Sequence, residues 1–172
     1  MDVQPGIVDR VDNKQEYLEK INEAVVYAHK KQIPVIYVVV GFRTGFPEVS
    51  PNNKSFTTME QATRKALIDP RPVNDPIGSD VVVVKRRVSA FSGSDLEVLL
   101  RAKNVKHLVL AGIATSGVVL STTRQAADKD YQLTILSDLC ADTDPEVHSL
   151  LIGKIFPRQA TVITSEEWVT QL

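Results

Sequence analysis

The sequence contains a single cysteine, Cys140, among its 172 residues. One thiol cannot close an internal disulfide, and Cys140 has no cysteine or histidine beside it at metal-ligand spacing. No apolar run approaches the roughly 18 residues of a membrane span, and the first residues do not form a basic segment leading into an apolar one. These absences exclude a disulfide scaffold and give no sign of an anchor or export signal, so we expect a cytoplasmic protein that does not bind membranes.

The chain also lacks an excess of charge of either sign. Twenty basic residues stand against twenty-one acidic ones, for a formal charge of -1, and no block of like charge is present. Electrostatics alone therefore recruit no nucleic acid, and we expect a small-molecule substrate instead. With 43% hydrophobic residues, the chain can bury a sizeable core, and we expect one domain over residues 1–172.

Short apolar runs alternate with segments of helical periodicity along most of the chain. Almost every residue in these runs is apolar, as expected for strands that are covered on both faces. This alternation predicts an α/β fold, with a mainly parallel sheet and crossover helices. The five internal strands that we expect are Val35–Val40, Val81–Val84, Leu108–Ala111, Leu133–Leu136 and Thr161–Ile163.

Helices are predicted between these runs by capping residues and apolar spacing. The stretch from Thr115 to Asp128 is expected to be helical throughout. A capping box pairs an N-cap side chain with a glutamate or glutamine three residues later. Four such pairs stand before predicted helices, namely Asp12 with Gln15, Ser94 with Glu97, Thr143 with Glu146, and Thr164 with Glu167.

The segment from Gly41 to Ile77 interrupts the alternation. It holds most of the prolines and few periodic apolar residues, so we expect a long excursion with one short helix from Thr57 to Ile68. Long loops at the carboxyl ends of strands are where α/β proteins commonly place their ligands. The excursion is therefore expected to border the functional site.

A turn from Gly112 to Gly117 follows one predicted strand and opens a helix. Free backbone N–H groups and the positive end of the helix dipole would favour an anion or oxyanion there. The two-glycine spacing matches that of a P-loop, but Val118 and Val119 occupy the places of its lysine and hydroxyl residue, so we reject nucleotide binding. An ordinary strand-to-helix turn is the alternative.

Two charged residues are candidates for acid/base chemistry. Lys85 follows four valines at the end of a predicted strand, and Asp2 precedes a turn sequence. At one sheet edge the pair could hold and shuttle a proton, because the ammonium stabilises the carboxylate. Taken alone, the lysine is more often a solvated surface charge, and the aspartate is uninformative.

Three segments together resemble the motif blocks of the isochorismatase-like hydrolase superfamily, in order and in spacing. They are Asp2-Val3-Gln4, Lys85 through Ser89-Ala90-Phe91, and Gly112-Ile113-Ala114-Thr115 through Val118 to Thr122. The likeness covers nearly the whole chain. It implies a Rossmann-like three-layer αβα fold with a sheet of six parallel strands.

The resemblance also implies roles for particular residues. The family's triad is an aspartate, a lysine and a cysteine, which correspond here to Asp2, Lys85 and Val118. Valine has no nucleophilic atom. Residues implied to form the oxyanion or substrate-binding site are Ala114, Thr115, Gly117, Arg43 and Phe91.

Some expectations about this site are more detailed. The resemblance implies that the amides of residues 114 and 118 face the pocket and that the Ile113–Ala114 peptide is cis. Arg43 or Lys54 would bind a substrate carboxylate. The family's nicotinamidases carry a histidine-rich metal site after the second strand, but the excursion has no histidine from Gly41 to Phe56. We therefore expect no metal and no cofactor.

Three functions remain open. Amide hydrolysis by the family's route requires a cysteine thiolate, which Val118 cannot supply, so an amidase would need another residue. Cys140 lies well beyond the nucleophile position and is expected to be inert packing. Vinyl-ether hydrolysis needs only protonation by an acid, for which Asp2 beside Lys85 suffices. A silent binding or scaffold protein is the third possibility.

The resemblance further implies a homo-oligomer. The sequence departs from the family's pattern at one place, directly before Asp2. Family members carry an apolar strand directly before the catalytic aspartate, whereas here only Met1 precedes Asp2. A central strand is therefore expected to be missing. Either the chain begins at an internal methionine of a longer protein, or the remaining strands close over the gap.

Overall fold

The computed structural model describes residues 1–59 and 61–171. Five parallel strands in this part of the chain form two separate sheets. β1 (Ile36–Val40) pairs with β2 (Val81–Lys85). In the second sheet β3 (His107–Ile113) pairs with β4 (Gln132–Ala141), which pairs with β5 (Thr161–Ile163). All five predicted strands are confirmed, with β4 longer than predicted at its carboxyl end.

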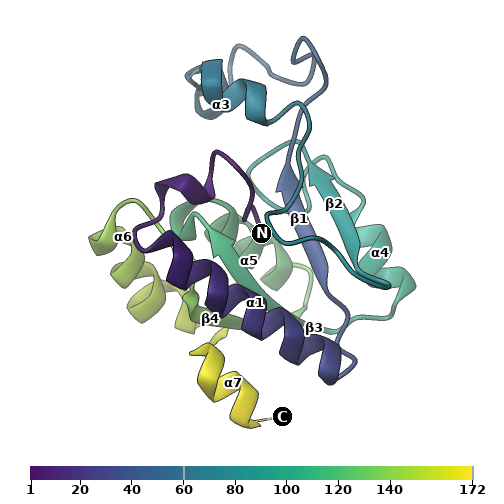
Figure 1. Cartoon of the computed structure of the whole chain (residues 1–172), viewed down its shortest axis with the longest axis vertical. Helices are drawn as coiled ribbons and strands as arrows, with labels where there is room; N and C mark the ends of the chain where they lie inside the picture. Colours follow the sequence, from purple (N-terminus) through teal and green to yellow (C-terminus); the bar gives the residue numbers. More distant parts are fainter. Residues whose placement is uncertain (60, 172) are drawn as a thin grey trace.

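Helices cover both faces of this layer of strands (Figure 1). On one face, α1 (Lys14–Lys30) and α7 (Ser165–Gln171) share a hydrophobic core with β4. On the other face lie α4 (Leu96–Ala102) and α5 (Leu120–Ala127), with α6 (Pro145–Leu150) nearby. The α/β architecture predicted from the alternating pattern is confirmed. No described helix is long and apolar enough to cross a membrane.

The two sheets do not close over the gap between β1 and β3. Of the two expected outcomes for the missing strand, closure of the remaining sheet is therefore wrong. Residues of α1 and α4 line a cavity between β1 and β3, together with residues of both strands. A six-stranded sheet, as the resemblance implies, is not formed by the described residues.

The excursion projects beyond the strands (Figure 1). It contains two short helices, α2 (Lys54–Thr57) and α3 (Gln61–Ala66), in place of the single predicted helix from Thr57 to Ile68. Residue 60, within that predicted range, lies outside the described residues. Phe42, Phe56 and Leu67 form a small core of the excursion that includes Val40 at the end of β1.

Only the last of the four predicted capping boxes forms in full. The amide of Thr164 donates to Glu167, and the amide of Glu167 donates to the Thr164 hydroxyl, with nitrogen to oxygen distances of 2.7 and 3.1 Å. At α6 the cap is Asp144 instead of Thr143, because the Asp144 carboxylate accepts from the amides of Glu146 and Val147 while Pro145 fixes the first helical position.

The other two predicted boxes are wrong, because Gln15 and Glu97 bind other side chains and not the backbone at the start of the helix. Gln15 binds Glu19 on the exposed face of α1, and that helix is preceded by Asn13 in a left-handed conformation. Glu97 pairs with Arg101 and Lys129. The predicted helix from Thr115 to Asp128 is confirmed, but its first turn, Thr115–Val119, is π-helical and α5 begins only at Leu120.

Candidate active site

The first two residues bridge the two sheets at their carboxyl edge. The amino group of Met1 donates to Ala111 O at 2.8 Å, and the amide of Ile113 donates to Met1 O at 3.1 Å. This is the hydrogen-bond pattern of a parallel ladder, with Met1 opposite Gly112. On the other side, the amide of Asp2 donates to Val38 O at 2.7 Å. Asp2 is thereby fixed between the two sheets.

Asp2 and Lys85 form a buried ion pair at this edge. The Lys85 Nζ atom lies 2.9 Å from Asp2 Oδ2 and donates a second bond of 2.9 Å to Arg87 O. Lys85 is 1% exposed and Asp2 is 6% exposed. The alternative of a solvated surface lysine at the strand end is therefore wrong, because β2 ends beneath the loops that follow it.

The second carboxylate oxygen of Asp2 has a different environment. Oδ1 is buried and has no hydrogen-bond partner among the residues that the structure describes. Burial raises the pKa of Asp2, and the Lys85 ammonium opposes this effect. A carboxyl group that is kept protonated at higher pH, with one unoccupied oxygen, has the properties of a general acid.

Val118 lies in the turn that follows β3, close in sequence to the ladder that holds Asp2. It is 2% exposed and belongs to the same core cluster as Val83 of β2. The Ile113–Ala114 peptide bond is cis, as predicted. Gly112, directly before it, has φ of +148°, and a Cβ atom at that position would collide with the carbonyl of Met1. The turn thus requires glycine where the Met1 backbone approaches.

Hydrogen bonds fix the predicted oxyanion turn to neighbouring elements. Thr115 is fully buried, and its hydroxyl lies 2.9 Å from Nδ1 of His148 on α6. The amide of Ser116 donates to Asp142 at 2.7 Å, and the amide of Gly117 donates to Ala114 O at 3.1 Å. Since the Gly117 amide is already bonded within the turn, it is a poorer donor to a substrate oxygen than its position in the sequence indicates.

Arg43 lies in the excursion and is exposed, with 69% of its side chain accessible. It pairs with Glu48, which also approaches Arg86 with a nitrogen to oxygen distance of 3.5 Å. Arg87 donates to the main-chain oxygen of Glu48 at 3.0 Å. Arg43 of the excursion and Arg86 and Arg87, which directly follow Lys85, therefore meet at Glu48, a cluster that no local pattern in the sequence indicated.

The Ser89-Ala90-Phe91 segment is attached to α5 rather than aimed at Asp2. The Ser89 hydroxyl donates to Gln125 at 2.6 Å, and the amide of Ala90 donates to Thr122 at 3.0 Å. Phe91 is buried and stacks on Tyr131, with ring centroids 6.1 Å apart. In this arrangement Phe91 contributes to the core that supports the Lys85 turn.

Gln4 is a residue of this region whose role was not predicted. It is 1% exposed, and its side-chain amide both donates to Val40 O at 3.0 Å and accepts from Val40 N at 2.8 Å. The side chain replaces the backbone of a neighbouring strand at the end of β1. A glutamine two residues after Asp2 was the available signal, but its partner is 36 residues away in the sequence.

The three histidines lie apart, each with its own polar neighbour. His29 lies 2.9 Å from Asp80, His107 lies 2.9 Å from Thr134, and His148 contacts Thr115. Within residues 1–59 and 61–171, no three histidine, cysteine or acidic side chains gather in a way that could hold a metal ion. The histidines therefore have structural contacts in separate parts of the fold.

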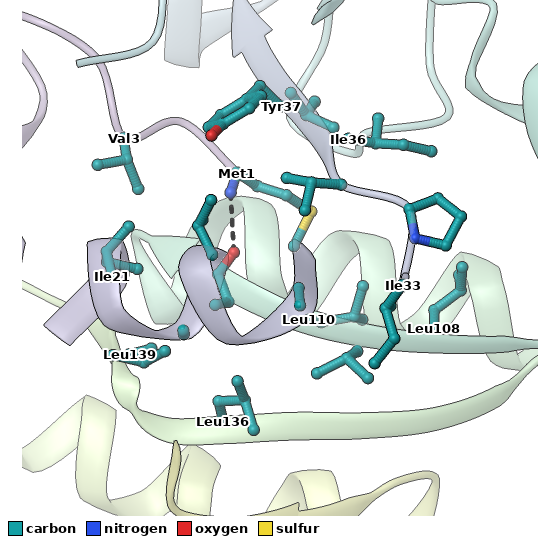
Figure 2. A pocket seen from close by; sticks show the side chains of 18 of the residues that line it. Met1, Val3, Ile21, Ile33, Ile36, Tyr37, Leu108, Leu110, Leu136 and Leu139 are labelled. Atoms are coloured by element: carbon teal, nitrogen blue, oxygen red, sulfur yellow. Dashed lines mark hydrogen bonds between the residues drawn. The ribbon is translucent and has the colours of Figure 1, made fainter. Parts of the chain in front are cut away.

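Figure 2 shows a cavity lined largely by apolar side chains, among them Met1, Ile36 and Leu110. It has a volume of about 280 Å³ and occupies the gap between β1 and β3, on the amino side of Met1. Asp2, Lys85 and Val118 do not line it. Asp2 is only 6% exposed, so the candidate acid has little contact with solvent.

Cys140 is expected to be unreactive in the folded protein. It is buried on β4 opposite Gly112, and burial raises the pKa of its thiol to about 12. We predict that iodoacetamide at pH 8 labels Cys140 at least about a hundredfold more slowly in native protein than in guanidinium chloride, because thiolate is the reacting form. Rapid stoichiometric labelling of folded protein, followed by mass spectrometry, would contradict this assignment.

The model of the Isochorismatase domain family matches residues 1–167 of the chain. The chain belongs to the isochorismatase family. It is 30% identical over 175 residues to the uncharacterized isochorismatase family protein YecD of Escherichia coli O157:H7, and the match covers 100% of this chain and 93% of that protein. It is 25% identical over 178 residues to a probable inactive nicotinamidase of Arabidopsis thaliana, covering 99% of this chain and 90% of that one.

Solved structures of isochorismatase family proteins have the same fold. An isochorismatase family protein from Burkholderia thailandensis superimposes with a TM-score of 0.84 at 26% sequence identity, and the match covers 99% of this chain and 93% of that chain. The resemblance inferred from the three motif blocks is thereby confirmed at the level of family and fold.

Proposed function

We propose that this isochorismatase-family chain hydrolyses a small carboxylated enol ether, with Asp2 as the general acid. The observation that best supports the proposal is the environment of the two carboxylate oxygens of Asp2. Oδ1 is buried and has no hydrogen-bond partner among the described residues, while Oδ2 pairs with the ammonium of Lys85. Such a carboxyl group can carry a proton on Oδ1 and deliver it to a bound carbon atom. Val118 takes no part in this chemistry.

The reaction balances without a nucleophilic side chain. Asp2 transfers its proton to the terminal carbon of the enol ether, and the ether oxygen stabilises the resulting cation as an oxocarbenium ion. Water adds to the cationic carbon and loses a proton, which returns to the Asp2 carboxylate. The hemiketal then collapses to a ketone and an alcohol. The Lys85 ammonium stabilises the carboxylate formed in the first step.

The arginine cluster is the proposed recognition site for the substrate carboxylate. Arg43 and Arg86 both pair with Glu48, and Arg86 directly follows Lys85 at the end of β2. A substrate carboxylate can exchange with the Glu48 carboxylate, because guanidinium groups bind either anion in the same geometry. This exchange would also release the segment around Glu48 and open the enclosed site.

Three substrate assays test the proposal. Pyruvate release from isochorismate by the wild-type chain is the expected result. Ammonia release from simple amides would instead favour an amidase that uses another residue. Binding of isochorismate in calorimetry without turnover would favour the silent function described next.

A catalytically silent binding protein is the second candidate, and two observations favour it. The position of the family's nucleophile is occupied by Val118, and neither Asp2 nor Lys85 lines the cavity between β1 and β3. One relative, of which the match covers 90%, is itself described as a probable inactive nicotinamidase. Against this candidate stands the buried Asp2–Lys85 pair, since a charged pair of this kind is costly to bury and adds little stability.

Val118→Cys separates an acid-catalysed site from a disabled amidase. Cysteine is slightly smaller than valine, so we expect the variant to fold with a loss of less than about 1.5 kcal/mol. Turnover of isochorismate should be retained within a few-fold, because the proposed mechanism uses no atom of residue 118. A gain of amide hydrolysis, measured as ammonia release, would assign the pocket to an amidase that has lost its nucleophile.

The pH dependence of turnover tests the role of Lys85. Activity requires protonated Asp2, so kcat/KM should fall as the pH rises through the pKa of Asp2. In Lys85→Met the ammonium that opposes the burial effect is gone, and the fall should occur about 1 pH unit or more higher. An unchanged profile, recorded with both proteins folded by circular dichroism, would remove Lys85 from the mechanism.

Assembly into a homo-oligomer, as the family resemblance implies, remains a prediction. Sedimentation velocity of the purified chain would test it directly.

A further inference from the structure

The segment that follows β4 holds the turn after β3 at two points. The carboxylate of Asp142 accepts from the amide of Ser116, with a nitrogen to oxygen distance of 2.7 Å. The Nδ1 atom of His148 lies 2.9 Å from the hydroxyl oxygen of Thr115. Asp142 directly follows β4 and His148 lies on α6, so both side chains come from one short stretch of the chain. We call these two contacts the clamp.

The clamped turn has an unusual backbone. It is the π-helical turn Thr115–Val119, in which the amide of Val119 donates to the carbonyl five residues back, Ala114 O, at 3.3 Å. Helical turns of this kind are rare and are frequently found at functional sites. The contacts that hold this turn in place therefore bear on the candidate site beside it.

The two partners in the contact at Thr115 differ in their exposure. Thr115 is fully buried, whereas His148 is half-buried. A buried hydroxyl group without a hydrogen-bond partner costs free energy, and the imidazole of His148 supplies this partner. If the imidazole is lost, the Thr115 hydroxyl has to find another partner, and the turn that carries Val118 shifts with it.

The contact at Ser116 is of a different kind, because Asp142 is charged. Burial acts to raise the pKa of Asp142, but hydrogen bonds from Ser116 and from the amides of Asp144 and Thr143 outweigh this effect, so the pKa is lowered. A hydrogen bond to a carboxylate is stronger than one between neutral groups. A substitution of Asp142 would remove this charge as well as the contact, so His148 is the better position for testing the clamp.

We propose that His148 is a positioning residue of the candidate site, which together with Asp142 fixes the turn between Asp2 and Val118. His148 acts through Thr115 and not on the substrate. The turn follows Ile113, whose amide donates to Met1 O directly before Asp2, at 3.1 Å. A misplacement of about 1 Å can lower a rate roughly a hundredfold. This inference rests on the proposed hydrolysis, since it assigns a role in that reaction.

Three substitutions at His148 separate positioning from packing. Asparagine places an amide group where Nδ1 stands, and this group can donate or accept, so His148→Asn keeps the contact with Thr115. Glutamine carries its amide one bond further out and leucine has none, so His148→Gln and His148→Leu lose the contact. With isochorismate we expect kcat to stay within about threefold of wild type in His148→Asn and to fall at least about tenfold in the other two, while KM changes less than about threefold.

Hydrogen exchange at the amide of Ser116 is a second measurement, and it does not require turnover. Exchange should be at least about tenfold faster in His148→Gln and His148→Leu, because the clamp has lost one of its two points, and unchanged in His148→Asn. The double variant Thr115→Val with His148→Leu should be no worse than His148→Leu in either measurement, since both changes remove the same contact. If the wild-type chain releases no pyruvate, the proposed hydrolysis fails, but the order of the exchange rates still decides whether His148 holds the turn.

Two results would overturn the proposal. Wild-type kcat and wild-type exchange at Ser116 in folded His148→Leu would show that the contact positions nothing. Effects that follow side-chain size, with asparagine the most damaging of the three, would show that His148 only fills space. Circular dichroism and Tm identify the folded variants, and the comparison of asparagine with glutamine, which carry the same amide group, decides the question if the leucine variant does not fold.

Discussion

Replacing Asp2 with asparagine should abolish turnover of an enol-ether substrate. Asparagine is nearly isosteric but has no acidic proton, and positioned acid catalysis typically contributes about 10²–10⁴ in rate. We therefore expect kcat/KM to fall at least a hundredfold or so, measured as ketone release. Asp2 has φ of +56°, a left-handed conformation that asparagine adopts as readily as aspartate, so the backbone of the bridge should persist.

A second variant keeps this prediction testable if Asp2→Asn loses stability. Removing the carboxylate leaves the Lys85 ammonium buried without its counterion, which is costly. In the double variant Asp2→Asn with Lys85→Met, both charges are gone, and Tm should recover toward the wild-type value while activity stays absent. Turnover within a few-fold of wild type in a folded Asp2→Asn protein would exclude Asp2 as the acid.

Gly112→Ala should disrupt the bridge between the sheets. The residue has φ of +148°, and an added Cβ would collide with the Met1 carbonyl, which is backbone and cannot rotate away. Strain at such a position costs about 1–3 kcal/mol, and the loss of the bonds between Met1 and β3 adds to it. We expect Tm to fall by roughly 5–10 °C, with a parallel loss of activity because Asp2 is displaced.

Gly153→Ala is the matched control for this substitution. A Cβ at Gly153 meets nothing within 4 Å, and this glycine lies in the helical turn Leu151–Ile155, far along the chain from the bridge. Its Tm and activity should stay close to those of the wild type. Equal effects of the two substitutions, measured by calorimetry and turnover, would contradict the role assigned to Gly112.

Much of the fold could be predicted because the strands are buried on both faces. A strand such as Val81–Lys85 is nearly all apolar, and the local pattern alone identifies it. The Asp2–Lys85 pair followed from placing both residues at the carboxyl edge of one layer of strands. That step needed the arrangement of the strands in the sheet as well as the local pattern, and the family resemblance supplied this arrangement.

Interactions between residues distant in sequence could not be predicted. Gln4 binding to Val40 and the gathering of arginines around Glu48 depend on how the loops fold back over the strands. The helix caps show a local version of the same difficulty. Asp144 and Thr143 are both plausible caps by composition, and the choice depends on the position of Pro145.

The pairing of the strands could not be read from the sequence alone. Each strand is recognisable from its own apolar run, but which strands pair depends on how the chain folds in three dimensions. In the structure β1 pairs with β2 and β3 pairs with β4, while hydrogen bonds of Met1 and Asp2 connect the two sheets.

The most direct test of the central claim is hydrolysis of isochorismate by the wild-type chain in water enriched in oxygen-18. Acid catalysis by Asp2 predicts that pyruvate is released and that the alcohol product keeps its original ether oxygen, because water adds to the former enol carbon. Mass spectrometry of the alcohol should therefore detect no oxygen-18. Oxygen-18 in the alcohol, or binding of isochorismate without any release of pyruvate, would contradict the account.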